Sequence, residues 1–155
     1  MENIQLLNNM KEKIIFAIDF DGTCVTHDYP NVGHDIGAAP ILRRLVAEGH
    51  QLILWTMRCD SGVESGKFKS GLTDAVNWFK ENNIPLYGIQ RNPTQDNWTK
   101  SPKAYAQLYI DDAALGAPLK YDNSISDRPF IDWVIVEKLM LRMGVLTDEN
   151  NQPQN

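Results

Sequence analysis

The chain has 155 residues, of which 43% are hydrophobic and 23% are charged, and its net charge is −5. These values are typical of one globular domain, and they disfavour a general nucleic-acid binder, which needs a basic face. No apolar run reaches the ~20 residues of a membrane span, and the N-terminus lacks a signal-peptide core. We therefore expect no membrane contact. The two cysteines, Cys24 and Cys59, suggest a reducing compartment rather than a disulfide framework, so a cytoplasmic location is expected.

Four short apolar runs predict the strands of a parallel sheet. The first, at 14–20, is apolar on both faces, as a central parallel strand is. The others are expected at 51–55, 86–89 and 108–110. Because these strands alternate with helical patterns, we expect an α/β fold: a three-layer, Rossmann-like parallel sheet with helices on both faces.

Three amphipathic helices are predicted between and after these strands. The first begins near Pro40 and ends at Gly49, a residue that commonly follows the end of a helix. The second has apolar residues at helical spacing from Leu72 to Phe79. The third is expected at 129–143.

The chain is predicted to form a single catalytic domain at 1–146, followed by a flexible C-terminal tail at 147–155. Polar loops are expected at 22–37, 58–71 and 90–103. A loop as long as the one at 90–103 usually has a functional reason to exist.

Polar residues stand at the ends of three predicted strands. Asp19 and Asp21 end the first strand, Thr56 ends the second, and Asp111 and Asp112 end the fourth. Because the carboxyl ends of parallel strands share one edge of a sheet, we expect these side chains to converge. Clustered carboxylates repel one another unless a cation is present, and hard oxygen ligands suit Mg²⁺. The sequence therefore predicts a magnesium site at this edge.

An acidic cluster that holds Mg²⁺ favours a phosphorylated substrate. An ionised aspartate can attack phosphorus and form an aspartyl-phosphate, while a second carboxylate protonates the leaving group and later activates water. A threonine hydroxyl and a lysine would complete such a site, because phosphoryl transfer depends mostly on positioning and charge neutralisation.

The same residues resemble the motifs of a known family, the phosphatases of the haloacid dehalogenase (HAD) superfamily. Asp-Phe-Asp-Gly-Thr at 19–23 resembles their first motif, and the apolar strand at 52–56, which ends in threonine, resembles their second. The segment 103–112, with a lysine ahead of a strand that ends in paired acids, resembles the third and fourth. The motifs occur in the family's order and cover most of the chain.

The resemblance implies a role for each motif residue. Asp19 would be the nucleophile and a Mg²⁺ ligand, and Asp21 would be the general acid/base, with its backbone carbonyl on the metal. Lys103 would neutralise Asp19 and the phosphate. Asp111 and Asp112 would complete the metal site. The residues expected around the phosphoryl group are Gly22, Thr23, Thr56, Arg58 and Lys103.

Several assignments have alternatives. Lys100 lies three residues ahead of Lys103 and is the second candidate for the family's lysine. Arg58 either binds the phosphate or is a solvated loop residue. His27 could line the entrance to the site, but a role as an ordinary surface residue is the simpler interpretation. Trp98 could contact the leaving group of the substrate or anchor its own loop.

The interval between Asp21 and Pro40 is too short for an inserted cap domain of about 50 residues. We therefore expect a capless HAD-like core, whose open site accepts a bulky substrate or is closed by another subunit of a homo-oligomer.

The predicted function is a Mg²⁺-dependent phosphomonoester hydrolase that acts on a phosphorylated small molecule. Removal of phosphate from nucleic-acid ends is an alternative that the acidic charge disfavours. A non-catalytic module that binds phosphate or a partner is the alternative from a different class. A phosphorylatable receiver domain is disfavoured, because its acidic pair precedes the phosphorylated aspartate.

Overall fold

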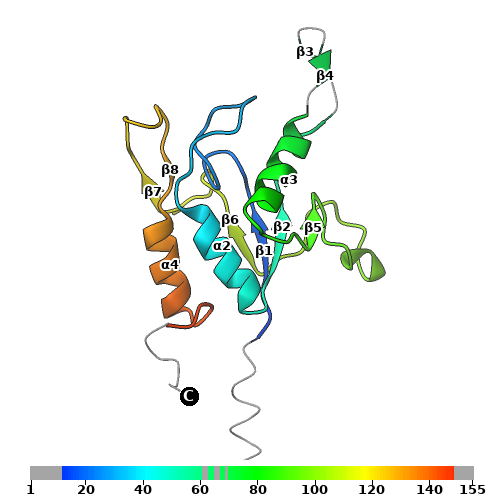
Figure 1. Cartoon of the computed structure of the whole chain (residues 1–155). Coiled ribbons are helices and arrows are strands. Elements are labelled where there is room, and N and C mark those ends of the chain that lie inside the picture. Colours follow the sequence, from blue (N-terminus) through cyan, green and yellow to red (C-terminus); the bar gives the residue numbers. More distant parts are fainter. Residues whose placement is uncertain (1–11, 61–62, 65–66, 69, 149–155) are drawn as a thin grey trace, which may run out of the picture.

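The centre of the structure is a four-stranded parallel sheet with the order β5-β2-β1-β6 (Figure 1). The computed structural model describes residues 12–60, 63–64, 67–68 and 70–148. The strands of the sheet are β1 (Ile15–Ile18), β2 (Gln51–Leu54), β5 (Gly88–Ile89) and β6 (Leu108–Ile110). The predicted α/β fold and its parallel sheet are confirmed. Each strand lies within its expected range, and the first three are shorter than predicted.

The register of the sheet brings the predicted site residues to one edge. Ile18 of β1 pairs with Leu54 of β2 on one side and with Ile110 of β6 on the other. The next residues continue this alignment, since the N–H of Asp19 donates to the carbonyl of Ile110 at 3.0 Å. The side chains that follow β1 and β6 are therefore neighbours because of strand pairing.

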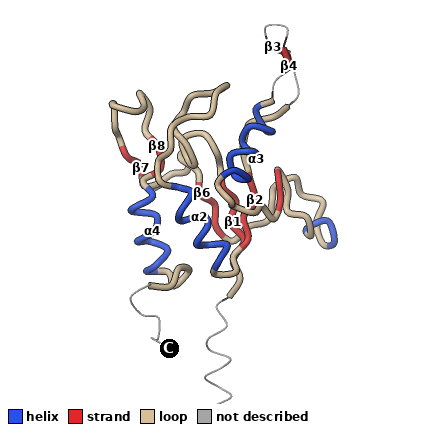
Figure 2. The backbone as a smooth tube through the Cα atoms, viewed as in Figure 1, coloured by secondary structure: helices blue, strands red, loops and turns tan. Residues whose placement is uncertain are grey.

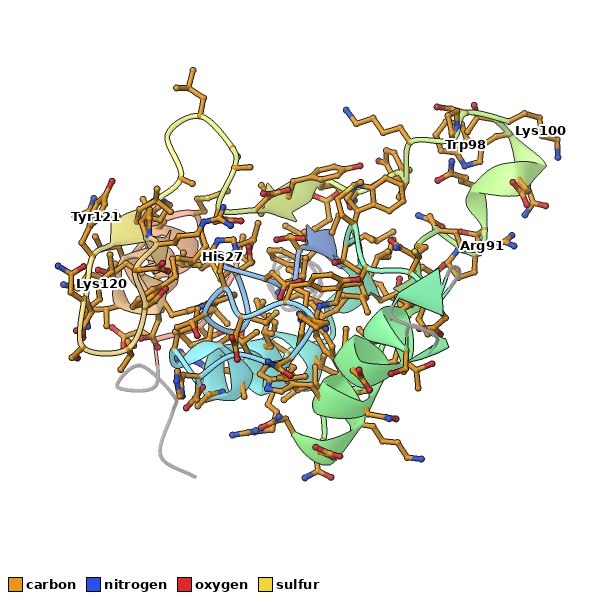
Figure 3. All side chains as sticks on the ribbon, turned by 90° about the horizontal axis from the view of Figure 1, so that it is seen from above. His27, Arg91, Trp98, Lys100, Lys120 and Tyr121 are labelled. Carbon is orange, nitrogen blue, oxygen red and sulfur yellow. The ribbon has the colours of Figure 1, made fainter. Side chains whose placement is uncertain are left out.

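Three α-helices pack against the sheet through one apolar core (Figures 1 and 3). They are α2 (Ala38–Ala47), α3 (Gly71–Glu81) and α4 (Trp133–Arg142). Phe16 and Ile18 of β1 belong to this core, together with buried residues of all three helices. Strand residues two positions apart share a face, so the three helices lie on the same side of β1.

A layer of helices was expected on the opposite face of the sheet, but an irregular segment covers it instead. Ala17 and Ile53 point to this face and are fully buried. In the described part of the chain, this face is crossed by the connection from β5 to β6, residues 90–107, which contains only the short 3₁₀ helix η1 (Gln95–Asn97) (Figures 2 and 3). Apolar periodicity indicates helices, but it does not indicate which face of a sheet each helix covers.

Two small antiparallel pairs occur where the sequence predicted other structure. Strands β3 (Val63–Glu64) and β4 (Lys67–Phe68) pair within the predicted 58–71 loop. Strands β7 (Leu119–Lys120) and β8 (Phe130–Ile131) pair beside α4.

The predicted 129–143 helix therefore starts later than expected. The Asp132 carboxylate accepts hydrogen bonds from the backbone N–H groups of Val134 and Ile135, which fixes the start of α4 at Trp133. Of the predicted C-terminal tail, residues 149–155 lie outside the described part of the chain. None of the described helices is long and apolar enough to cross a membrane.

Candidate active site

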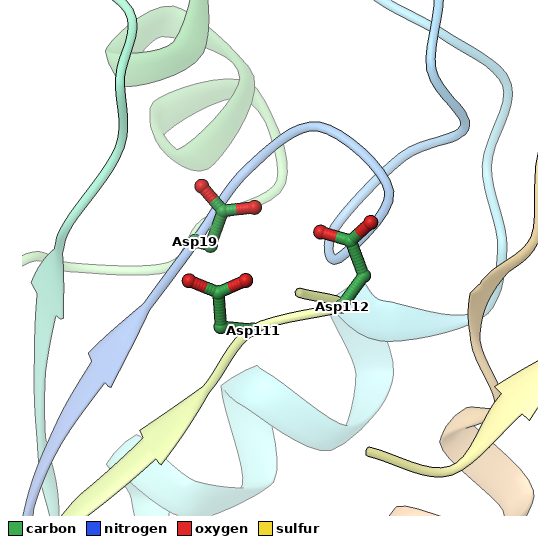
Figure 4. Close-up of side chains that lie close together, drawn as sticks. All are labelled: Asp19, Asp111 and Asp112. Atoms are coloured by element: carbon green, nitrogen blue, oxygen red, sulfur yellow. The ribbon is translucent and has the colours of Figure 1, made fainter. Parts of the chain in front are cut away.

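Three carboxylates meet at the carboxyl edge of the sheet (Figure 4). Asp19 follows β1, Asp111 and Asp112 follow β6, and one oxygen from each lies within 4.8 Å of the others. Opposite ligands of a Mg²⁺ ion lie about 4.2 Å apart, because each bond is about 2.1 Å long. Small side-chain rotations would therefore let the three oxygens share one hard cation.

The surroundings of Asp19 strongly raise the pKa of its carboxyl group. Burial raises its pKa from 3.8 to about 7, and the negative charges of Asp111 and Asp112 add to the rise. Hydrogen bonds from the Phe20 backbone and the Thr23 side chain act in the opposite direction. A cation held by the three carboxylates would relieve their repulsion and favour the ionised form of Asp19.

Thr23 ties the ends of β1 and β6 together. Its hydroxyl donates to Asp19 Oδ2 at 3.1 Å and accepts from the backbone N–H of Asp112 at 3.1 Å. Trp133, the first residue of α4, donates from its indole nitrogen to the Thr23 carbonyl at 2.7 Å. Thr23 was expected near the phosphoryl group, and in the structure its fully buried side chain contacts the Asp19 carboxylate and the backbone of Asp112.

Gly22 lies where His27 and Asp112 meet. His27 Nε2 is 2.9 Å from Asp112 Oδ2, so this histidine fixes one member of the acidic cluster. A Cβ atom at position 22 would lie 2.1 Å from His27 Nε2 and 2.7 Å from Asp112 Oδ2, and Gly22 also has a φ of +78°. The close approach therefore requires glycine. The role of His27 was missed from the sequence, because 85 residues separate it from Asp112.

Asp21 is held by Arg58 rather than by the acidic cluster. The Arg58 Nε and Nη2 groups donate to Asp21 Oδ2 and Oδ1, both at 2.7 Å. The other N–H groups of Arg58 donate to the carbonyls of Asn31, Pro30 and Gly71, at 2.6, 3.5 and 3.5 Å. All five guanidinium N–H groups therefore have protein acceptors.

Burial reinforces this arrangement of Arg58. Only 2% of the residue is exposed, and its guanidinium carbon lies 5.0 Å from the Phe20 ring centroid and 5.1 Å from that of Tyr29. The sequence suggested either a phosphate ligand or a solvated loop residue. The structure instead gives Arg58 the role of a buried clamp that joins Asp21 to the loop at 29–31 and the start of α3.

Thr56 and Asp19 line the same hollow, as the sequence predicted. The hollow has a volume of about 390 Å³, and its lining residues are Asp19, Trp55, Thr56, Met57, Gln90 and Asp111. Met57, which lines this hollow, is almost fully exposed.

Gln90 fixes the backbone of Thr56 within this hollow. Its side-chain oxygen accepts from the Thr56 N–H at 3.0 Å, and its side-chain nitrogen donates to the carbonyls of Thr56 and Arg58. Gln90 also has a φ of +58°, which is uncommon outside glycine. The sequence-based prediction missed Gln90, although its position directly after β5 matches the strand-end rule that found the other site residues.

Lys103 lies on the same side of β6 as Asp111, but it is stacked on an aromatic ring. Its Nζ lies 5.5 Å from the ring centroid of Tyr109. Tyr109 and Asp111 are two residues apart along an extended backbone, so their side chains lie on the same face of the sheet. Within the described residues, neither Lys103 nor Lys100 forms an ion pair with Asp19. The Lys100 amine donates to the carbonyl of Asp96 instead.

Comparisons with known proteins support the fold. A conserved protein of known structure from Bacteroides thetaiotaomicron is similar, with a TM-score of 0.64 and 28% sequence identity. The similarity covers 92% of this chain and all of that chain. No protein-family model and no curated protein matches the sequence.

Proposed function

We propose that this protein is a Mg²⁺-dependent phosphomonoester hydrolase. The observation that carries the proposal is the meeting of Asp19, Asp111 and Asp112 at the carboxyl edge of a parallel sheet. Two of these acids, Asp19 and Asp111, line one hollow with Thr56. Ligands bind at this edge in open α/β sheets. The order of the motifs along the chain, which resembles that of HAD phosphatases, gives independent support.

The donor set suits a hard divalent cation. Asp19, Asp111 and Asp112 would hold the Mg²⁺ ion, together with the backbone carbonyl of Asp21. Bound Mg²⁺ would neutralise the phosphoryl oxygens and the clustered carboxylates. Thr23 and His27 support the proposal, because they orient two of the three carboxylates through hydrogen bonds.

In the proposed reaction, a carboxylate oxygen of Asp19 attacks phosphorus, and the bond from phosphorus to the leaving oxygen breaks. Thr56 would hydrogen-bond a phosphoryl oxygen. Asp21 would turn away from Arg58, take up a proton from solvent and give it to the leaving oxygen. Water then attacks the phosphoryl group and returns the electron pair to Asp19, while Asp21 takes the proton from water.

Lys103 remains the proposed cation for the phosphate. The Lys103 side chain lies on the same side of β6 as Asp111. Its long flexible chain would let the amine move from the Tyr109 ring toward the acidic cluster. A phosphorylated small molecule is the proposed substrate class.

The test is phosphate release from an aryl phosphate, with Mg²⁺ and with a chelator. We expect release only with Mg²⁺, and an Asp19→Asn variant should lose activity by at least about a thousandfold, because no nucleophile remains. Asp96→Asn is the matched control, since Asp96 is an exposed aspartate that pairs with Arg91. Release without Mg²⁺, or equal release by Asp19→Asn, would contradict the proposal.

A further inference from the structure

The connection between β5 and β6 has a fixed shape, although little of it is regular secondary structure. Two buried amide side chains hold it, Asn92 at 2% exposure and Gln95 at 6%. The Asn92 amide donates to the carbonyl of Tyr105 at 2.9 Å. Gln95 donates to the carbonyl of Lys103 at 3.0 Å and accepts from the N–H of Tyr105 at 2.8 Å. Side chains on this segment are therefore presented from a pre-organised backbone, which reduces the entropy lost on binding.

This segment encloses a second hollow of about 290 Å³, distinct from the one that contains Asp19. Its aromatic lining comes from Trp98, Tyr105 and Tyr109, which are 64%, 45% and 37% exposed. The Trp98 and Tyr105 rings meet edge to face, with centroids 5.3 Å apart. A loop anchor would be buried, so the exposure of Trp98 favours a ring that is open to a ligand.

The second hollow adjoins the acidic cluster. Tyr109 of β6 lines it, and Asp111 directly follows β6, two residues after Tyr109 and about 6.6 Å further along the direction of the strand. Lys103 also lines this hollow, with its amine over the Tyr109 ring. A phosphate bound at the acids would therefore lie about the length of one sugar from Tyr109, which lines the same hollow as Trp98.

We propose that this hollow is a subsite for the planar ring of the leaving group, and that the substrate is a nucleotide-like phosphate monoester. This inference rests on the proposed phosphatase function. The ring would stack on Trp98, the sugar would span the region beside Tyr109, and Lys103 would face the phosphate. Aromatic side chains that stack on bases, together with a nearby cation, are the usual means of holding nucleotides without reading their sequence.

The test is calorimetric binding to the Asp19→Asn variant, which prevents turnover. Adenosine monophosphate and ribose 5-phosphate form a matched pair, because they share the sugar and the phosphate and differ by the ring. We expect the nucleotide to bind about 5- to 150-fold more tightly, the range that stacking of one base provides. Equal affinities would overturn the proposal.

Substitutions in the same background locate the ring. Trp98→Ala should bring the affinity for the nucleotide close to that for ribose 5-phosphate, whereas Trp98→Phe should keep most of the difference. Tyr121→Ala is the control, because Tyr121 is 76% exposed and lies at the other end of the molecule (Figure 3). An equal loss of affinity for both ligands in Trp98→Ala would show damage to the segment and contradict stacking.

Binding of a 5′-phosphorylated oligonucleotide tests whether the ring belongs to a free nucleotide or to the end of a nucleic acid. Binding equal to that of the mononucleotide would identify a free nucleotide as the substrate, and tighter binding would identify a nucleic-acid end; either result supports the subsite. Failure of the phosphatase proposal is separable, because it appears as absent turnover by wild type, whereas failure of the subsite appears as lost discrimination in binding.

Discussion

Arg58 and Asp21 form a bidentate ion pair, in which two guanidinium N–H groups donate to the two carboxylate oxygens at 2.7 Å each. Asp21 is also the proposed proton donor for the leaving group. Both of its oxygens are engaged by a buried arginine, so proton transfer requires this pair to break. The relationship therefore has consequences for catalysis and for stability.

The first prediction concerns leaving groups. Because release of Asp21 from Arg58 costs free energy, protonation should assist departure only weakly. Across a series of aryl phosphates, kcat/KM should fall steeply as the pKa of the released phenol rises, since kcat/KM covers the steps through cleavage of the P–O bond. Asp21→Asn should steepen this dependence. A wild-type rate that does not depend on the phenol would show that Asp21 already donates efficiently.

The second prediction concerns the stability of the same pair. Arg58→Met leaves the Asp21 carboxylate without its partner, so the free energy of unfolding should fall by about 3 kcal/mol or more in urea denaturation. The double variant with Asp21→Asn should recover part of this loss. Arg91→Met is the control, because Arg91 has an exposed ion pair, and its effect should stay within about 0.5 kcal/mol. Equal losses for the two arginines would refute the clamp.

The third prediction separates crowding from backbone strain at Gly22. Gly22→Ala should displace His27 and Asp112 and weaken Mg²⁺ binding by at least about tenfold, the usual effect of disturbing groups around metal ligands. Gly37→Ala is the matched control, since Gly37 has a φ of +87° and open space around its Cβ position. It should cost about 1 kcal/mol of stability and leave Mg²⁺ affinity unchanged. Loss of Mg²⁺ affinity in both variants would point to strain alone.

The fourth prediction concerns how the stability of the folded protein depends on pH, and how Mg²⁺ changes that dependence. Burial and neighbouring acids raise the pKa of Asp19 from 3.8 to about 7, so between these values the folded state holds a proton that the unfolded chain has released. Without metal, the Asp19 contribution to stability is therefore present at low pH and lost as the pH rises toward 7.

Melting temperatures at pH 5.5 and pH 8, with and without Mg²⁺, test this prediction. Stabilisation by Mg²⁺ should be larger at pH 8, because the metal binds the ionised carboxylates. Asp19→Asn should remove most of this difference. Equal stabilisation by Mg²⁺ at the two pH values in wild type would contradict the prediction.

The sequence was a good guide to the sheet and to the acidic cluster, because both follow from local patterns. Apolar runs located all four strands of the sheet, and parallel pairing then brought Asp19 beside Asp111. The layer on the second face could not be predicted in the same way. It depends on hydrogen bonds of the Asn92 and Gln95 amides within an irregular segment, and such bonds have no periodicity.

The supporting residues were harder to predict than the acids. His27 contacts Asp112 only because the chain turns at Gly22, and nothing in the local sequence of either residue indicates the contact. Arg58 was expected either to bind the phosphate or to be a solvated loop residue, because the sequence does not show that three backbone carbonyls and Asp21 surround it.

The most direct test of the central claim is chemical trapping of the phosphorylated residue. Borohydride reduces an aspartyl-phosphate to homoserine, and peptide mass spectrometry then locates the change. After wild type has reacted with an aryl phosphate and Mg²⁺, we predict homoserine at position 19 and at no other aspartate. Phosphate release without homoserine at position 19, or with homoserine at another aspartate, would contradict the claim that Asp19 is the nucleophile.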